Sequence, residues 1–380
     1  MRTRRLIPGA MLAVALVMTG CAPPAPDETI PPRATSTPAA SPWPSARDGW
    51  WQASGEPTTL ASGLAAPWSV IPLPDGGALI SERDSGTIRE LTPEGELRTA
   101  GVVPGVVSGG ESGLHGLALR ADEAAGTWLY AYHGAADDNR VVRMPLSGEP
   151  GELRLGGAET VFTGIPRNST HNGGRIAFGP DGYLYVTTGD AQIRDAAQDP
   201  DALGGKILRL TPEGDPAPGN PFGTAVWTLG HRNVQGVAWT ADGEMWASEF
   251  GQDTWDELNH IVGGGNYGWP VVEGDAGDDT FSDPVVVWAT SEASPSGIAA
   301  VGSTVFVTGL RGERLWVVDL APGAEQARPA TVGLDAQGRL RDVVAAPDGS
   351  LWILTNNTDG RGSPRSDDDV LIRLPISPAT

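Results

Sequence analysis

The chain has 380 residues, a formal net charge of −21 and 39% hydrophobic residues, including 13 Trp, which supply ample apolar surface for a core. The acidic balance argues against nucleic acid or anionic lipid as the main partner. The single cysteine, Cys21, excludes structural disulfides within the chain and cysteine-based zinc sites. The 52 Gly and 33 Pro are typical of a chain with many turns.

The N-terminal residues 1–20 have the features of a secretory signal peptide. Three arginines at positions 2, 4 and 5 precede an apolar run over 7–18, which is too short to span a bilayer. The run ends in Met-Thr-Gly-Cys, which resembles a bacterial lipobox with Cys21 as the lipidated residue. An ordinary cleaved signal peptide is the alternative. The lipobox predicts an extracytoplasmic lipoprotein, anchored to a membrane through lipid alone.

The next segment, residues 21–47, is rich in Pro, Ala, Ser and Thr and has few large apolar residues. Such a composition cannot bury enough surface to fold and is typical of a tether. The folded domain is therefore predicted over residues 48–380.

A strand–turn–strand pattern recurs along this domain. Four copies turn at Asp-Gly, a strong hairpin signal, and two looser copies turn elsewhere. The copies lie at 68–81, 173–188, 235–248 and 341–355, with the looser ones at 116–132 and 297–308. Asp75 and Asp348 are 273 residues apart over five intervals, so the period is about 55 residues. This predicts an all-β, six-bladed β-propeller with four-stranded antiparallel blades; a pair of β-sandwiches is the alternative.

No long helix is expected. Segments 191–203 and 253–260 are predicted to hold one or two helical turns within loops. A propeller binds its ligand at the mouth of its central channel, where loops from every blade meet. Functional residues are therefore expected just after or between the repeated strands.

Two polar residues frame the hairpin over 173–188. His171 opens one strand and Asp190 follows its partner strand, so the two side chains are expected to lie close together. A carboxylate that orients an imidazole makes it a better general base. A purely structural His–Asp pair is the alternative.

Two further stretches carry reactive groups. Hydrogen-bond donors crowd between two glycines at 229–236. Several carboxylates occur within 249–259, and a glycine-rich stretch follows at 263–270. Carboxylates and accessible backbone carbonyls suit a hard cation such as calcium, although the spacing is not that of an EF-hand. A solvated acidic loop is the alternative.

Three late arginines, Arg311, Arg339 and Arg341, form a local basic set in an acidic chain. Guanidinium groups at one mouth bind a polycarboxylate or a phosphate bidentately. Pairing with neighbouring Asp and Glu is the alternative. The chain has no P-loop, no Rossmann fingerprint, no Gly-x-Ser-x-Gly elbow and no His-Glu-x-x-His motif.

Taken in order, these motifs resemble the soluble PQQ-dependent glucose/aldose sugar dehydrogenases. The similarity extends over about 60–375 and is carried by segments 113–119, 171–182, 229–233, 264–270 and 339–349. Members of this family are six-bladed propellers that use pyrroloquinoline quinone (PQQ) and calcium. The resemblance therefore implies oxidation of the anomeric hydroxyl of an aldose to a lactone.

The resemblance also implies roles for individual residues. His171 is the expected general base and Asp190 orients it. Arg232 hydrogen-bonds the quinone oxygen that gains charge, and Asn233 holds the cofactor beside it. Glu111 stands near the base, where the glucose dehydrogenases have a glutamine, and is expected among the cofactor-binding residues.

Cation and carboxylate contacts follow from the same resemblance. Backbone carbonyls of Gly251 and Gln252 are expected to bind the calcium that polarises the quinone. Glu257 and the carbonyl of Tyr267 resemble ligands of a second, structural calcium. The arginines of the late basic set are expected to face the cofactor's carboxylates.

The expected partners are a small sugar and an external electron acceptor of unknown identity. The chain is expected to attach to the membrane through its lipid and not to bind nucleic acid. Two other functions remain open: a calcium-dependent lactonase, which needs a cation ringed by side-chain carboxylates, and a non-enzymatic cell-surface binding propeller. Convergence of the His, Arg and acidic motifs on one pocket would favour the dehydrogenase over the binding protein.

Overall fold

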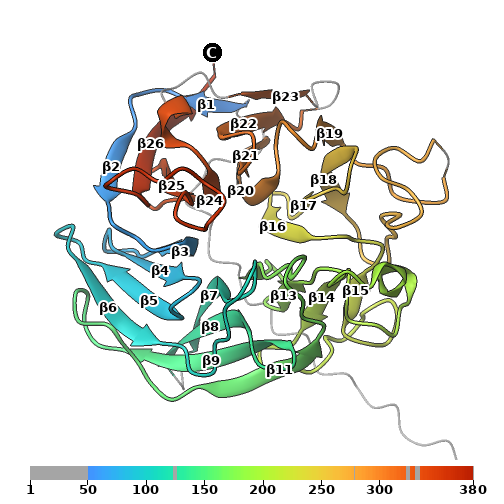
Figure 1. Ribbon diagram of the computed structural model, residues 1–380, viewed down its shortest axis with the longest axis horizontal. Helices are drawn as coiled ribbons and strands as arrows, with labels where there is room; N and C mark the ends of the chain where they lie inside the picture. Colours follow the sequence, from blue (N-terminus) through green and yellow to red (C-terminus); the bar gives the residue numbers. More distant parts are fainter. Residues whose placement is uncertain (1–49, 123–125, 278, 322–325, 330–333, 380) are drawn as a thin grey trace, which may run out of the picture. The chain divides into compact units, whose positions relative to one another are not determined.

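The computed structural model describes residues 50–379 except 123–125, 278, 322–325 and 330–333. Its strands form six antiparallel sheets, which follow one another around a common centre (Figure 1). The predicted six-bladed, all-β propeller is confirmed, and the pair of β-sandwiches is wrong.

The first three blades follow the chain in order. The first contains β3 (Pro67–Pro72), β4 (Ala78–Glu82), β5 (Thr87–Leu91) and β6 (Leu97–Val102). The second contains β7 (Leu114–Asp122), β8 (Gly126–Gly134), β9 (Asn139–Ser147), β10 (Arg154–Leu155) and β11 (Glu159–Ile165). The third contains β12 (Ile176–Phe178), β13 (Leu184–Thr187), β14 (Ile207–Leu210) and β15 (Val226–Thr228).

The last three blades complete the circle. The fourth contains β16 (Val234–Trp239), β17 (Met245–Glu249), β18 (Trp255–Ile261) and β19 (Val286–Ala289). The fifth contains β20 (Pro295–Val301), β21 (Thr304–Gly309), β22 (Arg314–Asp319) and β23 (Gln326–Pro329). The sixth contains β24 (Leu340–Ala345), β25 (Ser350–Thr355) and β26 (Leu371–Pro378), with β1 (Trp51–Ala53) and β2 (Thr58–Ala61) beside β26.

The sixth blade joins the two ends of the folded region. Both β1 and β2 pair antiparallel with β26, with Trp51 opposite Pro378 and Thr58 opposite Arg373. Because the first strands of the chain complete the last blade, backbone hydrogen bonds close the ring.

The four predicted Asp-Gly turns all connect the first and second strands of a blade. The glycine of each has a positive φ, from 79° at Gly182 to 92° at Gly76. A Cβ at any of these four glycines would meet no atom within 4 Å. Glycine is therefore required by the left-handed backbone that closes the hairpin and not by lack of space.

The hydrophobic core is divided among the spaces between blades. Each of six apolar clusters draws its buried side chains from two successive blades, and one joins the sixth blade to the first. The alternation of side chains along each strand buries both faces of a blade, because each face packs on a neighbour.

Helices are short in the described part of the chain. The predicted turn within 191–203 is the 3-10 helix η1 (Arg194–Gln198), and a second, η2, spans Asp335–Gln337. The turn predicted over 253–260 is wrong, because this segment belongs to β18. β18 pairs with strands on both sides, and this tertiary pairing overrides the local signal.

Among residues 50–379 as described, no helix is both long and apolar enough to cross a membrane. The predicted signal peptide, Cys21 and the tether lie outside the described residues.

The first strand of each blade lies nearest the common centre (Figure 1). These strands run in the same direction, so their N-terminal ends and the C-terminal ends of the second strands meet at one mouth. The loops there carry most of the predicted site residues.

Candidate functional site

A cavity of about 330 Å³ opens at this mouth, a volume within the range of small-molecule sites. Loops and strand ends from all six blades contribute to its wall. The lining residues are Trp68, Arg83, Glu111, His115, Asn172, Gly173, Gln235, Phe250, Ser294, Leu310, Arg311, Glu313, Arg339, Arg341, Asp359 and Arg361.

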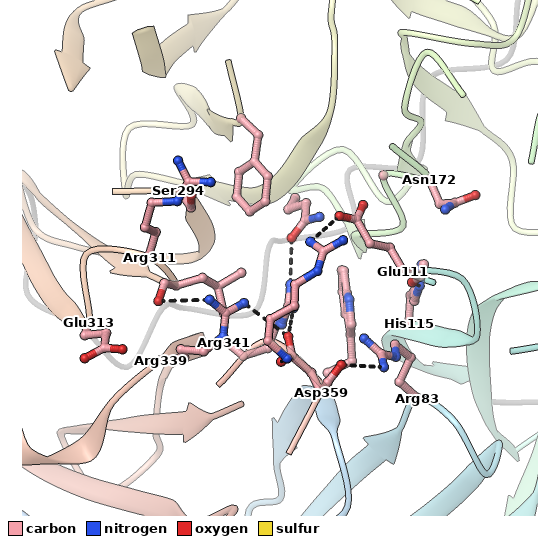
Figure 2. A pocket seen from close by; sticks show the side chains of 16 residues that line it. Arg83, Glu111, His115, Asn172, Ser294, Arg311, Glu313, Arg339, Arg341 and Asp359 are labelled. Atoms are coloured by element: carbon pink, nitrogen blue, oxygen red, sulfur yellow. Dashed lines mark hydrogen bonds and ion pairs between the residues drawn. The ribbon is translucent and has the colours of Figure 1, made fainter. Parts of the chain in front are cut away.

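The lining is positively charged although the chain is strongly acidic. Five arginines face three carboxylates in this wall, whereas the chain has 26 Lys+Arg against 47 Asp+Glu. Figure 2 shows Arg83, Arg339 and Arg341 around Asp359, with Arg311 on the side of Ser294. The local excess of guanidinium groups suits an anionic ligand with several carboxylates.

Asp359 organises two of the predicted arginines. Its carboxylate lies 3.1 Å from Arg339 and 3.8 Å from Arg341. Burial opposes ionisation of Asp359, but the two guanidiniums outweigh it and bring the pKa of this carboxyl below its usual value. Burial lowers the pKa of Arg341 to about 9, a change that Asp359 partly offsets.

The floor of the cavity is aromatic and polar. Arg341 lies over the ring of Trp68, with 5.8 Å from guanidinium carbon to centroid, and donates to Gln235 at 2.7 Å. His115 stacks on Trp68, with ring centroids 4.9 Å apart. Burial lowers the pKa of His115 to about 3, so this ring is a neutral part of the wall.

The predicted His171–Asp190 pair is present beside the cavity. Nδ1 of His171 lies 2.7 Å from Oδ1 of Asp190. His171 has a φ of 57°, so its backbone is left-handed where the chain enters β12. Two main-chain N–H groups are held by carboxylates here: that of His171 donates to Glu111 at 3.0 Å and that of Gln192 to Asp190 at 2.8 Å.

Arg232 lies on the other side of the imidazole. Its Nη2 is 2.9 Å from Nε2 of His171, and its Nε and Nη2 both donate to Oε1 of Gln252. Burial lowers the pKa of Arg232, while the charges of Asp190 and Glu249 act in the opposite direction. The arrangement places a guanidinium donor at the ring nitrogen that faces away from Asp190.

The neighbouring Asn233 is fully buried between blades. Its Oδ1 accepts a hydrogen bond from the N–H of Gly173 at 3.0 Å, and Gly173 lines the cavity. No described residue accepts a hydrogen bond from the buried Nδ2 of Asn233. This buried amide N–H is therefore a donor without an acceptor among the described residues.

The predicted cation residues fall into two groups. Gly251, Glu257 and Tyr267 line a small interior space of about 10 Å³, which suits a single water or ion. Gln252 does not line this space, and its side chain contacts Arg232 instead. The structure thus brings a residue of each predicted calcium site to one place.

The chemistry of this small space fits a hard cation. Glu249, Glu257 and Glu273 line it with one arginine, Arg232. Burial, with the charge of Glu249 adding to it, raises the pKa of Glu257 to about 8. Asn259 donates to Glu257 at 3.0 Å, and its own buried Oδ1 receives no hydrogen bond from a described residue. A cation bound in this space would offset the negative charge of the carboxylates that line it.

All three carboxylates already accept hydrogen bonds, Glu257 from Asn259 and from a main-chain N–H. Glu249 accepts hydrogen bonds from the N–H groups of Arg232 and Asn233, and Glu273 accepts from successive N–H groups of the loop after β17. Accordingly, no group of three His, Cys, Asp or Glu ready to hold a metal occurs in the part of the chain described. Backbone carbonyls would have to complete the coordination.

The sequence did not reveal several residues of the site. Trp269 donates from Nε1 to Oδ2 of Asp190 at 2.9 Å and lies between Arg194 and Arg232, 5.2 and 5.5 Å from ring centroid to guanidinium carbon. Arg83 and Asp359 follow the second strand of their blades, as Asp190 does. Alignment of the repeats would have pointed to these two, and Trp269 lies within segment 264–270, which carries the family resemblance.

The chain matches the sequence model of the glucose/sorbosone dehydrogenase family over residues 64–372. It is 30% identical to the aldose sugar dehydrogenase YliI of Escherichia coli, over 81% of this chain and 92% of that protein.

Solved structures show the same similarity. The PQQ-bound aldose sugar dehydrogenase of Streptomyces coelicolor is 48% identical, with a TM-score of 0.81 over 88% of this chain and all of that one. A putative oxidoreductase (glucose dehydrogenase) of Thermus thermophilus is 44% identical, with a TM-score of 0.76 over 84% of this chain and 99% of that one.

Proposed function

Because the chain belongs to the glucose/sorbosone dehydrogenase family, we propose that it oxidises the anomeric hydroxyl of an aldose to the lactone with PQQ and calcium. The family membership itself makes the chain a sugar-oxidising, PQQ-dependent oxidoreductase. The proposal goes beyond family membership in three respects: the use of calcium, the lactone product and the roles of individual residues.

One observation carries the proposal: the mouth of an acidic propeller is lined by five arginines, next to a His–Asp pair. PQQ has three carboxylates, and Arg311, Arg339 and Arg341 are the residues that would hold them. Asn233, whose Nδ2 has no acceptor among the described residues, would be a further donor to the cofactor. When bound, PQQ supplies a quinone that accepts hydride, chemistry that no side chain of this protein supplies.

The chain's own contribution is proton transfer and orientation. Asp190 accepts a hydrogen bond from the Nδ1–H group of His171, which leaves Nε2 as the basic nitrogen. His171 would take the proton of the sugar hydroxyl at Nε2 as that hydroxyl is oxidised. Arg232, which contacts the same nitrogen, would turn toward the oxygen that becomes negatively charged.

We propose that calcium binds in the small space lined by Gly251, Glu257 and Tyr267. Glu257 would supply a carboxylate and the other two residues their carbonyl oxygens. Gln252 is next to Gly251 in the chain. Its carbonyl would bind the other expected calcium, the one that polarises the quinone. The support is the buried carboxyl of Glu257, which no described ion pair neutralises and whose pKa is raised by burial to about 8.

The two other functions have less support. A lactonase of this fold needs a cation ringed by side-chain carboxylates at the central cavity, whereas the wall of that cavity holds five arginines against three carboxylates. A binding propeller has no use for a base aligned between Asp190 and Arg232 at the edge of an arginine-lined cavity.

The proposal is tested with the purified protein, PQQ, Ca²⁺ and a panel of aldoses, with dye reduction as the readout. Activity is expected to require both additions and to fall by about 10³-fold or more in His171→Ala. The matched control is His260→Ala. This change removes a half-exposed histidine of β18 that is paired with Glu244. Absence of PQQ binding, measured by calorimetry, would overturn the proposal.

The location is a separate proposal. We propose that the chain is an extracytoplasmic lipoprotein anchored through Cys21, with residues 21–47 as its tether, so that reduced cofactor passes electrons to an external acceptor. Expression of the full chain is expected to place it in the detergent phase, with lipid on Cys21 by mass spectrometry. A Cys21→Ser variant that partitions identically would show that no lipid is attached there.

A further inference from the structure

An ion pair crosses the mouth of the cavity between two distant loops. Nη1 of Arg361, on the loop after β25, lies 2.5 Å from Oε1 of Glu111, on the loop before β7. The two residues are 250 positions apart, and both line the cavity. Figure 2 shows Glu111 at the mouth, with its carboxylate joined to a guanidinium.

The main chain of Glu111 is fixed on both sides. Its N–H donates to the carbonyl of Ser169 at 2.8 Å, and its carbonyl accepts from Nε2 of His115 at 2.7 Å. The second carboxylate oxygen, Oε2, accepts the main-chain N–H of His171. Glu111 therefore links Arg361 to the backbone of the proposed base, which is held in the left-handed region.

The charge of Glu111 has one counter-ion among the described ion pairs, and this is Arg361. The other buried carboxylate of the wall, Asp359, is shared by Arg339 and Arg341, and it also accepts the main-chain N–H of Arg361. The side chain of Glu111 is 18% exposed and that of Arg361 52%. Loss of Arg361 would leave a mostly buried negative charge facing a cavity suited to anions.

We propose that Arg361 is a positioning residue that acts through Glu111: it holds the carboxylate that fixes the backbone of His171, and it neutralises that carboxylate so that an anionic ligand can bind. Arg361 is therefore needed only while residue 111 is an acid. This inference rests on the proposed function for the identity of the ligand, and its first test is independent of that identity.

The first test uses hydrogen exchange of the main-chain amides in the full chain labelled with ¹⁵N-histidine, without PQQ. Arg361→Gln is expected to speed exchange of the His171 amide about tenfold, because its acceptor loses its anchor. The other four histidine amides should change less than about twofold, and Arg361→Lys should restore most of the protection. An unchanged His171 rate in Arg361→Gln would overturn the positioning role.

The second test measures the dissociation constant of PQQ by calorimetry in a double-mutant cycle. Arg361→Gln is expected to weaken binding about tenfold, and Glu111→Gln with Arg361→Gln to return it to within about threefold of wild type. Arg373→Gln, which removes an arginine paired with Asp348 on β26, is the matched control. It is expected to leave the constant unchanged.

The outcomes separate the alternatives. If the double variant binds as weakly as Arg361→Gln, Arg361 contacts the ligand itself and the neutralising role is wrong. If wild type does not bind PQQ, the proposed function fails, and the exchange experiment alone decides whether Arg361 positions His171.

Discussion

Arg232 donates a hydrogen bond to Nε2 of His171 across 2.9 Å, while Nδ1 of the same ring lies 2.7 Å from Asp190. A guanidinium group has donors only, so Nε2 must be the acceptor and Nδ1 must carry the proton. The two neighbours thus select one tautomer of a neutral imidazole. This tautomer presents a basic nitrogen at the edge of the cavity, as a general base requires.

Asp190→Asn is expected to lower kcat by about 10³ to 10⁴-fold. The amide can donate to Nδ1, which would move the ring proton to Nε2, where it opposes Arg232. The measurement is steady-state dye reduction at saturating PQQ and sugar, with circular dichroism to confirm folding. A variant that retains more than about a tenth of the wild-type kcat would show that Asp190 does not set the tautomer.

Trp269→Phe tests the hydrogen bond from the indole of Trp269 to Asp190, the carboxylate that orients His171. The change removes the Nε1–H donor to Asp190 and keeps an aromatic ring between the two arginines. A hydrogen bond to a charged group contributes about 1.5–3 kcal/mol, so the free energy of unfolding should fall by that order.

The matched control is Trp352→Phe, because no described residue accepts a hydrogen bond from the indole nitrogen of Trp352. Both variants are measured by urea unfolding. Equal losses would mean that the indole–Asp190 bond contributes nothing specific.

Much of the fold could be predicted because the repeat is local. Asp-Gly turns between apolar strands occur at a regular period, and each marks the first hairpin of a blade. The His171–Asp190 pair was predictable for the same reason, since opposite ends of one hairpin lie together. By contrast, β18 was missed because its polar sequence becomes a strand only through pairing on both sides.

The contacts that sequence reasoning missed are long-range. Trp269 and Asp190 are 79 residues apart, and Arg361 and Glu111 are 250 apart. No spacing rule connects such residues, because they come together only when separate blades pack against one another. Arg83 is an intermediate case. It follows the second strand of its blade, a position that also holds site residues in other blades, so the repeat could have been used to predict it.

The carboxyl of Asp190 makes stability depend on pH. Burial by itself would raise its pKa, but hydrogen bonds from His171, the Gln192 N–H and Trp269 bring the pKa below the ordinary value of 3.8. A carboxyl whose pKa is lowered by folding stabilises the fold above its ordinary pKa and loses this contribution as pH falls through the folded-state value.

The free energy of unfolding of wild type minus that of Asp190→Asn should therefore be constant from pH 7 to about 5 and shrink below about 4. Urea titrations at these values are the measurement. A difference that grows as the pH falls would contradict the lowered pKa.

Cation binding at Glu257 should release protons. Burial, with the charge of Glu249 adding to it, raises the pKa of this carboxyl to about 8 when no cation is bound, so it is protonated at pH 7. A cation displaces the proton, and the affinity for Ca²⁺ should rise about tenfold per pH unit below 8 and level off above it.

Calorimetry in two buffers of different ionisation enthalpy measures the protons released, about one per Ca²⁺ at pH 7. Glu257→Gln is expected to abolish this binding, and Glu244→Gln, at an exposed carboxylate paired with His260, to leave it intact. Binding with no proton release would place the cation away from Glu257.

Arg311 is exposed, and its guanidinium donates to the carbonyl of Thr290. No ion pair joins it to a carboxylate within the described residues. Its charge is therefore available to a bound anion, whereas Arg339 already shares Asp359. Arg311→Gln should weaken PQQ binding about tenfold at low ionic strength.

Exposure of Arg311 also predicts screening by salt. The Debye length falls from about 30 Å at 0.01 M to about 3 Å at 1 M, so the difference between wild type and Arg311→Gln should shrink across this range. Arg314→Gln, which removes a guanidinium stacked on Trp316, is the matched control and should not change PQQ affinity. A loss of equal size at every salt concentration would mean that Arg311 acts through a hydrogen bond or packing rather than through its charge.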